Sequence, residues 1–147
     1  MVVRPSIRTA RTEDWTAIAD LLAECRLPVD DLNPAMLADF LVSERAGRIV
    51  GVVGSEPLGE DVLFRSLAVA PGCRGQGLAG ALTAELERRA RAGGATTAYL
   101  LTATAENFAW IRGFRVKPRE EAPAAVRNTA EFRHVCCASA RCMSKNL

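Results

Sequence analysis

The hydrophobic and polar positions of the chain follow two different periods. In segment 15–25 the apolar residues recur every three or four positions, and a polar run precedes them, so this spacing predicts an amphipathic helix. Segments 40–43 and 48–55 are instead rich in β-branched and other apolar residues around an Ala-Gly pair at 46–47, which predicts a β-hairpin. A proline opens a second expected helix, 34–40.

The second half of the chain alternates strand and helix signals. Segment 62–69 is strongly apolar and stops at Pro71, which predicts a strand. Segment 77–92 repeats leucines at helical spacing and ends at a Gly-Gly pair, which predicts a helix. This alternation indicates an α/β fold, and without a linker or an internal repeat we expect one domain over residues 1–147. The other predicted elements are a strand at 3–8, a strand at 96–102, a helix at 105–112, a strand at 113–116, a helix at 122–132 and an edge strand near 134–135.

Composition narrows the class of protein. With 147 residues, 49% of them hydrophobic and 24% charged, the chain can bury one core without disulfides or metals. The net charge of +2 is far from the concentrated positive surface that nucleic-acid binding requires, so we expect no nucleic-acid partner. No apolar run approaches the roughly 20 residues that span a bilayer, and the first residues lack a hydrophobic signal core. We therefore expect a cytoplasmic protein with no membrane partner.

Cysteine and histidine usage gives no clear metal or nucleophile site. The five cysteines, an odd number, do not resemble a secreted disulfide framework, and we expect reduced thiols. Thiolates are favoured ligands of soft metals and trivalent arsenic, but the neighbours Cys136 and Cys137 would point to opposite faces of a strand, which argues against a site with Cys142. We predict no metal. The only histidine, His134, lacks a Ser/Asp partner pattern, and a catalytic triad is not supported.

The most informative stretch is a glycine-rich turn between the strand 62–69 and the helix 77–92. Gly75 and Gly77 allow the backbone to approach an anion, and the N–H groups and positive dipole end of the helix attract it. Arg74 adds a positive charge. Alone, this turn fits an ordinary strand–helix connection equally well. The sequence lacks the Gly-Lys-Ser/Thr ending of a P-loop and the acidic residue about 20 positions later that a dinucleotide fold places.

The stretch from Leu67 to Ala79 resembles the acetyl-CoA signature of the GNAT N-acetyltransferase superfamily. Its pattern Arg/Gln-x-x-Gly-x-Gly/Ala is matched by Arg74, Gly77 and Ala79, and Ala105 with Gly113-Phe114 is similar to the second GNAT motif. The resemblance implies a GNAT fold, a mixed twisted sheet of six or seven strands flanked by helices, and acetyl-CoA as co-substrate. The cofactor-binding residues that it implies are Leu67, Ala68, Val69, Arg74, Gly75, Gln76, Gly77, Leu78, Ala79 and Thr102.

The same resemblance suggests a mechanism. Val69 would pair with the pantetheine arm, and the N–H of Leu67 would stabilise the oxyanion that develops when an amine attacks the thioester. The amine must lose a proton, and Glu56 is our candidate base, although a solvated carboxylate in a turn is an equally good interpretation. Arg65 alternates with Leu63 and Leu67, so we expect it on the thioester face, where it would clamp an acceptor carboxylate or oxyanion; a structural salt bridge is the alternative.

Two further observations bear on function. Segments 54–57, 65–71 and 123–132, followed by Cys136, resemble GNAT proteins of arsenic-resistance operons. We therefore expect an N-acetyltransferase for a small-molecule amine, an arsenic-containing or other toxic amino compound. However, Ala109 stands where many GNAT enzymes have a tyrosine that acts as a general acid and protonates the leaving CoA thiolate. The alternative function is a non-catalytic sensor or carrier that binds CoA or arsenic. Separately, exposed strands in this fold often pair, which makes a homodimer reasonable.

Overall fold

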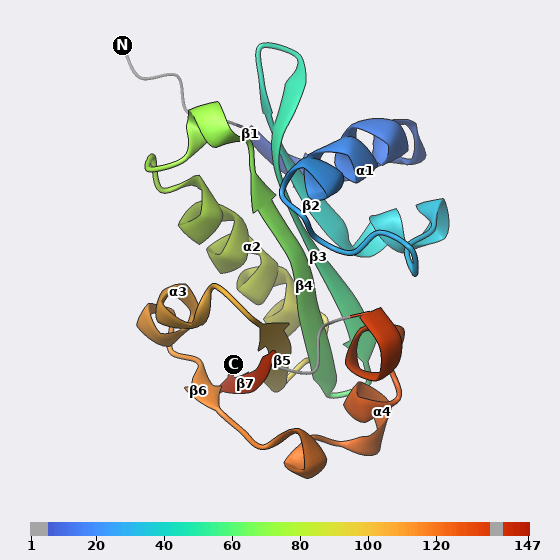
Figure 1. Ribbon diagram of the computed structural model, residues 1–147, viewed down its shortest axis with the longest axis vertical. Helices are drawn as coiled ribbons and strands as arrows, with labels where there is room; N and C mark the ends of the chain where they lie inside the picture. The colour runs from blue at the N-terminus through green and yellow to red at the C-terminus, as the bar shows by residue number, and fades with distance from the viewer. Residues whose placement is uncertain (1–5, 136–139) are drawn as a thin grey trace. The chain divides into compact units, whose positions relative to one another are not determined.

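The computed structural model describes residues 6–135 and 140–147, without the side chains of residues 134 and 135 (Figure 1). Seven strands form one mixed sheet in the order β1-β2-β3-β4-β5-β7-β6, which confirms the predicted α/β class and strand number. Internal contacts divide the chain into two compact units: unit 1 is 1–55 with 66–88, and unit 2 is 56–65 with 89–147. The expectation of one domain stays a prediction. Among the described residues no helix has the length and apolar character to cross a bilayer.

Unit 1 contains the predicted first helix and hairpin. The hairpin turns at Ala46 and Gly47, whose φ angles of +52° and +76° are those of a tight type I′ turn. The helix expected from Pro34 is a 3-10 helix that ends at Asp39, because Phe40 pairs with Gly54 in the sheet. The elements of this unit are β1 (Ser6–Thr9), α1 (Trp15–Glu24), the 3-10 helix η2 (Pro34–Asp39), β2 (Phe40–Arg45), and parts of β3 (Arg48–Leu58), β4 (Asp61–Val69) and α2 (Leu78–Ala92).

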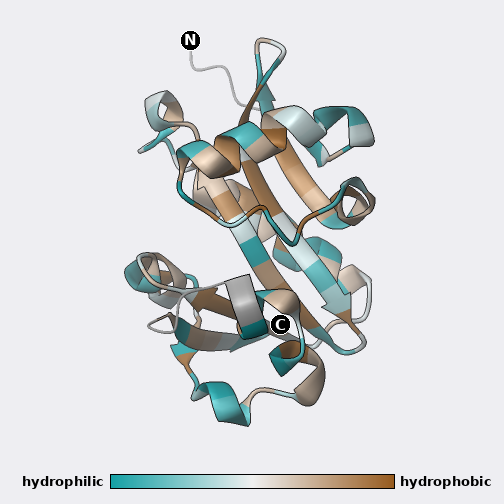
Figure 2. Cartoon of the chain, turned by 45° about the vertical axis from the view of Figure 1, so that its right-hand side comes forward, coloured by the Kyte–Doolittle hydropathy of each residue, from teal (hydrophilic) through white to brown (hydrophobic). Residues whose placement is uncertain are grey.

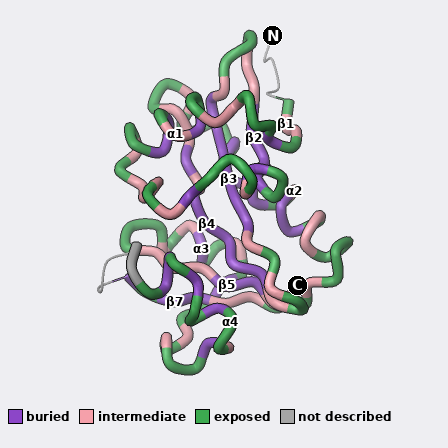
Figure 3. The backbone as a smooth tube through the Cα atoms, turned by 90° about the vertical axis from the view of Figure 1, so that its right-hand side faces the viewer, coloured by how far each residue is buried: buried purple, intermediate pink, exposed green. Residues whose placement is uncertain are grey.

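Helices α1 and α2 cover opposite faces of the unit 1 strands. On the α1 face, Ile18 and Leu22 are buried against residues of β2, β3 and β4. Figure 2 shows hydrophobic segments of these strands in brown, and Figure 3 shows buried segments of β2, β3 and β4 in purple. On the other face, α2 packs so closely on β3 that a Cβ at Gly51 would lie 2.9 Å from a methyl of Leu82. Since neighbouring strand residues point to opposite faces, Val52 serves one layer and Gly51 the other. This packing fixes the start of α2 beside the sheet.

Unit 2 departs from the predictions near its end. The helix predicted at 122–132 is a short helix followed by a π-helical turn, and the edge strand predicted near 134–135 lies within that turn. The last strand is β7, which inserts between β5 and β6 and pairs with both. The elements are β5 (Thr97–Thr102), α3 (Glu106–Ile111), β6 (Arg115–Val116), the 3-10 helix η4 (Arg119–Glu121), α4 (Ala124–Arg127), the π-helix η5 (Glu131–Val135) and β7 (Arg141–Asn146).

The position of β7 explains why its sequence shows no alternation. An interior strand buries both of its faces, and in β7 the neighbours Cys142 and Met143 are both buried. Cys142 joins a core with Leu63 and Tyr99. The strand 96–102, the helix 105–112 and the strand 113–116 are confirmed with boundaries shifted by one to two residues.

The tight packing of Gly54 against Phe40 gives a stability prediction. A Cβ at Gly54 would lie 2.3 Å from the ring of Phe40, whose side chain is fully buried and has little room to move. We expect Gly54→Ala to lower the free energy of unfolding by about 1–3 kcal/mol or more through overpacking. Chemical denaturation measures this change.

The matched control is Gly72→Ala, because Gly72 has no atom within 4 Å of a built Cβ and no positive φ. This control should be neutral or slightly stabilising. In a Phe40→Ala background the cost of Gly54→Ala should largely disappear. Equal costs in the two backgrounds would contradict the proposed clash.

Candidate functional site

The loop between β4 and α2 is open to solvent. After the turn η3 (Pro71–Cys73), the residues 74–77, here called the glycine loop, are all exposed, and α2 begins at Leu78. Gly75 and Gly77 have φ angles of +77° and +80°, which non-glycine residues adopt only with strain. A Cβ built at either glycine would meet no atom within 4 Å. The backbone of this loop is therefore accessible to a ligand from outside.

The positive end of the α2 helix dipole has no acidic residue in the first turn to offset it. The first N–H groups of a helix have no partner within the helix, and a negative group nearby usually stabilises them. The first turn of this 15-residue helix contains no acidic residue, whereas its last turn contains Arg89 and Arg91, which suit the negative end. Together with the open glycine loop, this end of α2 is suited to an anion such as a phosphate.

Arg74 folds back on the strand that precedes it. Its Nε donates a hydrogen bond to the carbonyl of Val69 at 3.0 Å, and its Nη2 lies 3.3 Å from Sγ of Cys25. The thiol of Cys25 also faces the Val69 carbonyl, at 3.8 Å. Arg74 thus holds the turn from β4 into the glycine loop, while the rest of its guanidinium keeps a positive charge beside that loop.

Strand β4 is irregular at Ser66. This residue has a φ of +59°, a left-handed conformation in the middle of a strand. The pairing of β3 with β4 indicates one inserted residue in β4. The strands are joined by the two-residue loop 59–60, and regular pairing from this loop would place Val50 opposite Val69. The N–H of Ala70 instead donates to the carbonyl of Val50, so the register has shifted by one residue. The two-residue alternation therefore does not continue across Ser66, so spacing alone no longer places Arg65 and Leu67 on one face.

The ladder between β4 and β5 is short. Parallel pairing joins Asp61–Leu63 to Thr97–Tyr99 and ends there. The later residues of β4 form no further ladder pair with β5 among the described residues. The side of this part of β4 that would face β5 therefore suits an extended ligand that offers amide groups of its own.

Glu56 and Arg65, which the sequence singled out for separate roles, are partners. Nη1 of Arg65 donates to Oε2 of Glu56 at 2.8 Å. The Arg65 side chain is completely buried, whereas 22% of the Glu56 side chain remains exposed. A guanidinium enclosed in this way is poorly placed to reach an acceptor, but it orients the carboxylate in front of it. The accessible group of this pair is Glu56.

Thr102, an expected cofactor-binding residue, and Ala109, which stands in place of a tyrosine, both make local backbone contacts. Oγ1 of Thr102 accepts a hydrogen bond from the N–H of Ala105 at 2.8 Å, which caps the turn into α3. Ala109 is buried in α3, and its carbonyl accepts the N–H of Phe114 at 2.9 Å. Neither residue brings an ionisable group to the site.

Arg45 lies at the glycine loop although the sequence did not single it out. Its Nη1 is 3.4 Å from Oε1 of Gln76. The signal that would have revealed it is the hairpin geometry: Arg45 ends β2 directly before the type I′ turn, and β3 runs back so that Val50 meets Ala70 just before the glycine loop. The tip of the β2–β3 hairpin and the glycine loop are thereby at the same end of unit 1.

The described cysteines differ strongly in exposure. Cys25 and Cys73 are half-buried, whereas Cys142 is 2% exposed. Burial raises the pKa of the Cys142 thiol, against the opposing charges of Arg119 and Lys117. Cys136, Cys137 and the side chain of His134 lie outside the described residues. Within the described part, no cluster of three or more His, Cys, Asp or Glu side chains is arranged to hold a metal ion.

Comparison with known proteins places these features in one family. A sequence model of a protein family, described as acetyltransferase (GNAT) family, matches residues 5–118 of this chain. The structure is similar to N-acetylglutamate synthase from Neisseria gonorrhoeae complexed with coenzyme A and N-acetyl-glutamate, with a TM-score of 0.85, 21% identity, and coverage of 100% of this chain and 36% of that one. This chain therefore spans about a third of the length of that synthase.

Two further solved structures are matched over almost their full length. Rv2747 from Mycobacterium tuberculosis, in complex with CoA and NLQ, has a TM-score of 0.80 and 24% identity, with 97% of this chain and 99% of that chain covered. A GNAT acetyltransferase from Staphylococcus aureus Mu50 has a TM-score of 0.78 and 16% identity, with 98% and 99% covered. At these identities the structural likeness establishes the fold.

The difference in thiol burial gives a labelling prediction. At neutral pH a maleimide should modify Cys25 and Cys73 in the native protein, whereas Cys142 should react only after denaturation, because its thiol is enclosed and its raised pKa disfavours the thiolate. Peptide mass spectrometry with and without denaturant measures this. Modification of native Cys142 at the rate of Cys73 would show that the core of unit 2 is more open than the structure indicates.

Proposed function

The chain belongs to the acetyltransferase (GNAT) family, and from this premise we propose that it transfers the acetyl group of acetyl-CoA to the amine of a small amino compound. The enzyme class and the co-substrate follow from the family. The acceptor and the roles of individual residues are our proposal. The observation that carries it is the open glycine loop at an α2 N-terminus without acidic residues, which suits the phosphates of CoA.

The residues of the loop are suited to the nucleotide end of the co-substrate. In our proposal the N–H groups of Gly75 to Ala79 donate to the pyrophosphate, and the positive charge of Arg74 lies beside it. The accessible backbone and the open space above both glycines support this role. Bound there, acetyl-CoA supplies an activated acyl group.

Strand β4 is suited to the pantetheine arm and the thioester. The ladder with β5 ends at Leu63, and the described residues 67–69 form no ladder pair with β5, which suits an amide-rich arm on that side. We assign the pairing to Val69 and the stabilisation of the developing oxyanion to the N–H of Leu67. Arg74 already donates to the Val69 carbonyl, which limits the movement of this backbone and favours a preorganised site.

Glu56 is the proposed general base, and Arg65 is a positioning residue that acts through it. The amine nitrogen forms a bond to the thioester carbon, the carbon–sulfur bond breaks, and the amine proton passes to Glu56 directly or through water. The buried guanidinium fixes one carboxylate oxygen, Oε2, while the side chain stays partly exposed. Such a carboxylate keeps a fixed orientation and remains accessible.

Protonation of the leaving thiolate needs no side chain of this protein in our proposal. Buried Ala109 has no proton to give, and CoA thiol is a fairly good leaving group, so water is the proposed proton source. The same position motivates the alternative, a non-catalytic module that binds CoA or an arsenical. The enclosed Cys142 is a poor thiolate ligand, so among the described cysteines only the half-buried Cys25 and Cys73 remain candidates for the arsenic binding of this alternative.

We propose an amino acid or an amino compound of similar size as the acceptor, with an arsenic-containing amino compound as the first candidate. The similarity to a synthase that was crystallised with N-acetyl-glutamate supports the amino-acid class. The resemblance of segments 54–57 and 65–71 to proteins of arsenic-resistance operons supports the arsenical. Both lines of support concern the acceptor and leave the loop chemistry unchanged.

The direct test combines binding and turnover. We expect calorimetry to detect acetyl-CoA binding, and release of free CoA to depend on an amine from a panel of amino acids and arsenical amino compounds. Acetylated product is identified by mass spectrometry. Binding without release across the whole panel would favour the carrier module instead, and absence of acetyl-CoA binding would overturn both proposals.

The base assignment gives a separate prediction. Glu56→Gln should lower kcat about 10²–10⁴-fold, because the amine then loses its assisted proton transfer, while acetyl-CoA affinity stays within about twofold. Steady-state kinetics and calorimetry on the same preparations measure these changes. Glu56→Gln removes the carboxylate that faces the buried charge of Arg65 and can lower stability, so the melting temperature of each variant is measured alongside.

The matched control is Glu60→Gln, which removes the same charge from an exposed position on the same hairpin. Its kcat should equal that of the wild type. Full activity of a folded Glu56→Gln variant would contradict the assignment of Glu56 as base.

A further inference from the structure

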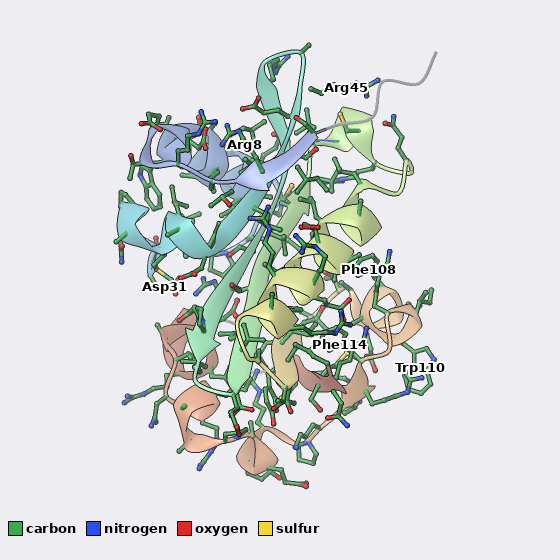
Figure 4. The ribbon with its side chains drawn as sticks, turned by 180° about the vertical axis from the view of Figure 1, so that it is seen from behind. Arg8, Asp31, Arg45, Phe108, Trp110 and Phe114 are labelled. Atoms are coloured by element: carbon green, nitrogen blue, oxygen red, sulfur yellow. The ribbon has the colours of Figure 1, made fainter. Side chains whose placement is uncertain are left out.

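The tip of the β2–β3 hairpin brings a charged side chain to the glycine loop. Arg45 contacts Gln76 through Nη1 and Oε1, which are 3.4 Å apart, and Figure 4 labels Arg45. Gln76 lies between the two glycines whose backbone is open to solvent. The contact between Arg45 and Gln76 therefore joins β2 to the glycine loop.

The hairpin holds Arg45 in a defined position. Arg45 pairs with Arg48 across the type I′ turn, and the turn residues Ala46 and Gly47 both have positive φ, as this turn type requires. Before it, Glu44 is engaged by Arg8, whose Nε donates to Oε1 at 3.0 Å. The neighbouring carboxylate is therefore already engaged by Arg8, and the contact of Arg45 is with the glycine loop.

The charge of Arg45 has no acidic partner in residues 6–135 and 140–147. Its contact with Gln76 is to a neutral amide, and the residue directly across the hairpin, Arg48, carries the same charge. Like charges directly opposite each other oppose strand pairing. An anion bound at the glycine loop would offset this repulsion and would satisfy further N–H groups of the guanidinium.

We propose that Arg45 is a further cofactor-binding residue, which donates hydrogen bonds to the phosphates of CoA from the hairpin side of the glycine loop. This rests on the proposed function, because it assumes that CoA occupies the loop. Backbone N–H groups approach the phosphates from α2, and Arg45 adds a planar, permanently charged donor that matches phosphate oxygens. Gln76 holds that donor beside the site before the ligand arrives.

The test compares two arginines of the same hairpin by calorimetry with acetyl-CoA. Arg45→Gln should raise the Kd for acetyl-CoA about tenfold or more, since it removes charge-assisted hydrogen bonds, and its affinity should depend less on salt than that of the wild type. Arg48→Gln removes the same charge from the position directly opposite Arg45 in the hairpin. Because Arg48 contacts no residue of the glycine loop, the Kd of this variant for acetyl-CoA should change less than about threefold. Melting temperatures establish that both variants are folded.

A second ligand separates the phosphate groups. If the loss seen in Arg45→Gln is as large with 3′-dephospho-CoA as with CoA, the contact is with the pyrophosphate; if it is confined to CoA, the contact is with the 3′-phosphate, and both results support the proposal. An unchanged Kd in folded Arg45→Gln, or an equal loss in Arg48→Gln, would overturn it. Failure of the wild type to bind acetyl-CoA would instead overturn the proposed function itself.

Discussion

Much of this structure depends on one constraint, the left-handed backbone of Ser66 inside β4. A non-glycine residue with a φ of +59° costs about 1–2 kcal/mol relative to an extended strand, so the surrounding structure must hold it there. Residues before it complete the core of unit 2 and place Arg65 against Glu56. Residues after it complete the core of unit 1 and lead into the glycine loop. An inserted residue within one strand thus changes which backbone groups and side chains the two halves of β4 present.

The elements with strong periodicity were predictable from the sequence. Helix α1, helix α2 and the β2–β3 hairpin follow from apolar spacing and turn residues, and the glycine loop follows from its place between a strand and a helix. The 3-10 helix after Asn33 was not distinguishable from an α-helix, because a proline start and a short apolar pattern fit both. Strand β7 was missed because a strand buried on both faces does not alternate.

The candidate site was predictable at the level of residue types and much less at the level of pairs. Glu56 and Arg65 are nine positions apart, and the register of the β3–β4 hairpin brings them to 2.8 Å. The contact between Arg45 and Gln76 depends in the same way on a register that apolar patterns do not specify. Local chemistry can thus be read from the sequence, whereas partnerships across strands require the fold.

The order of β6 and β7 has a consequence for how the chain is made. Strand β7 follows β6 in the sequence but lies between β5 and β6 in the sheet. While the chain is being synthesised, β5 and β6 therefore have no strand between them until residues 141–146 emerge from the ribosome. The core around Tyr99 also lacks Cys142 until then. Unit 2 can complete its sheet only after synthesis of this segment, whereas unit 1 can assemble from residues that are made earlier.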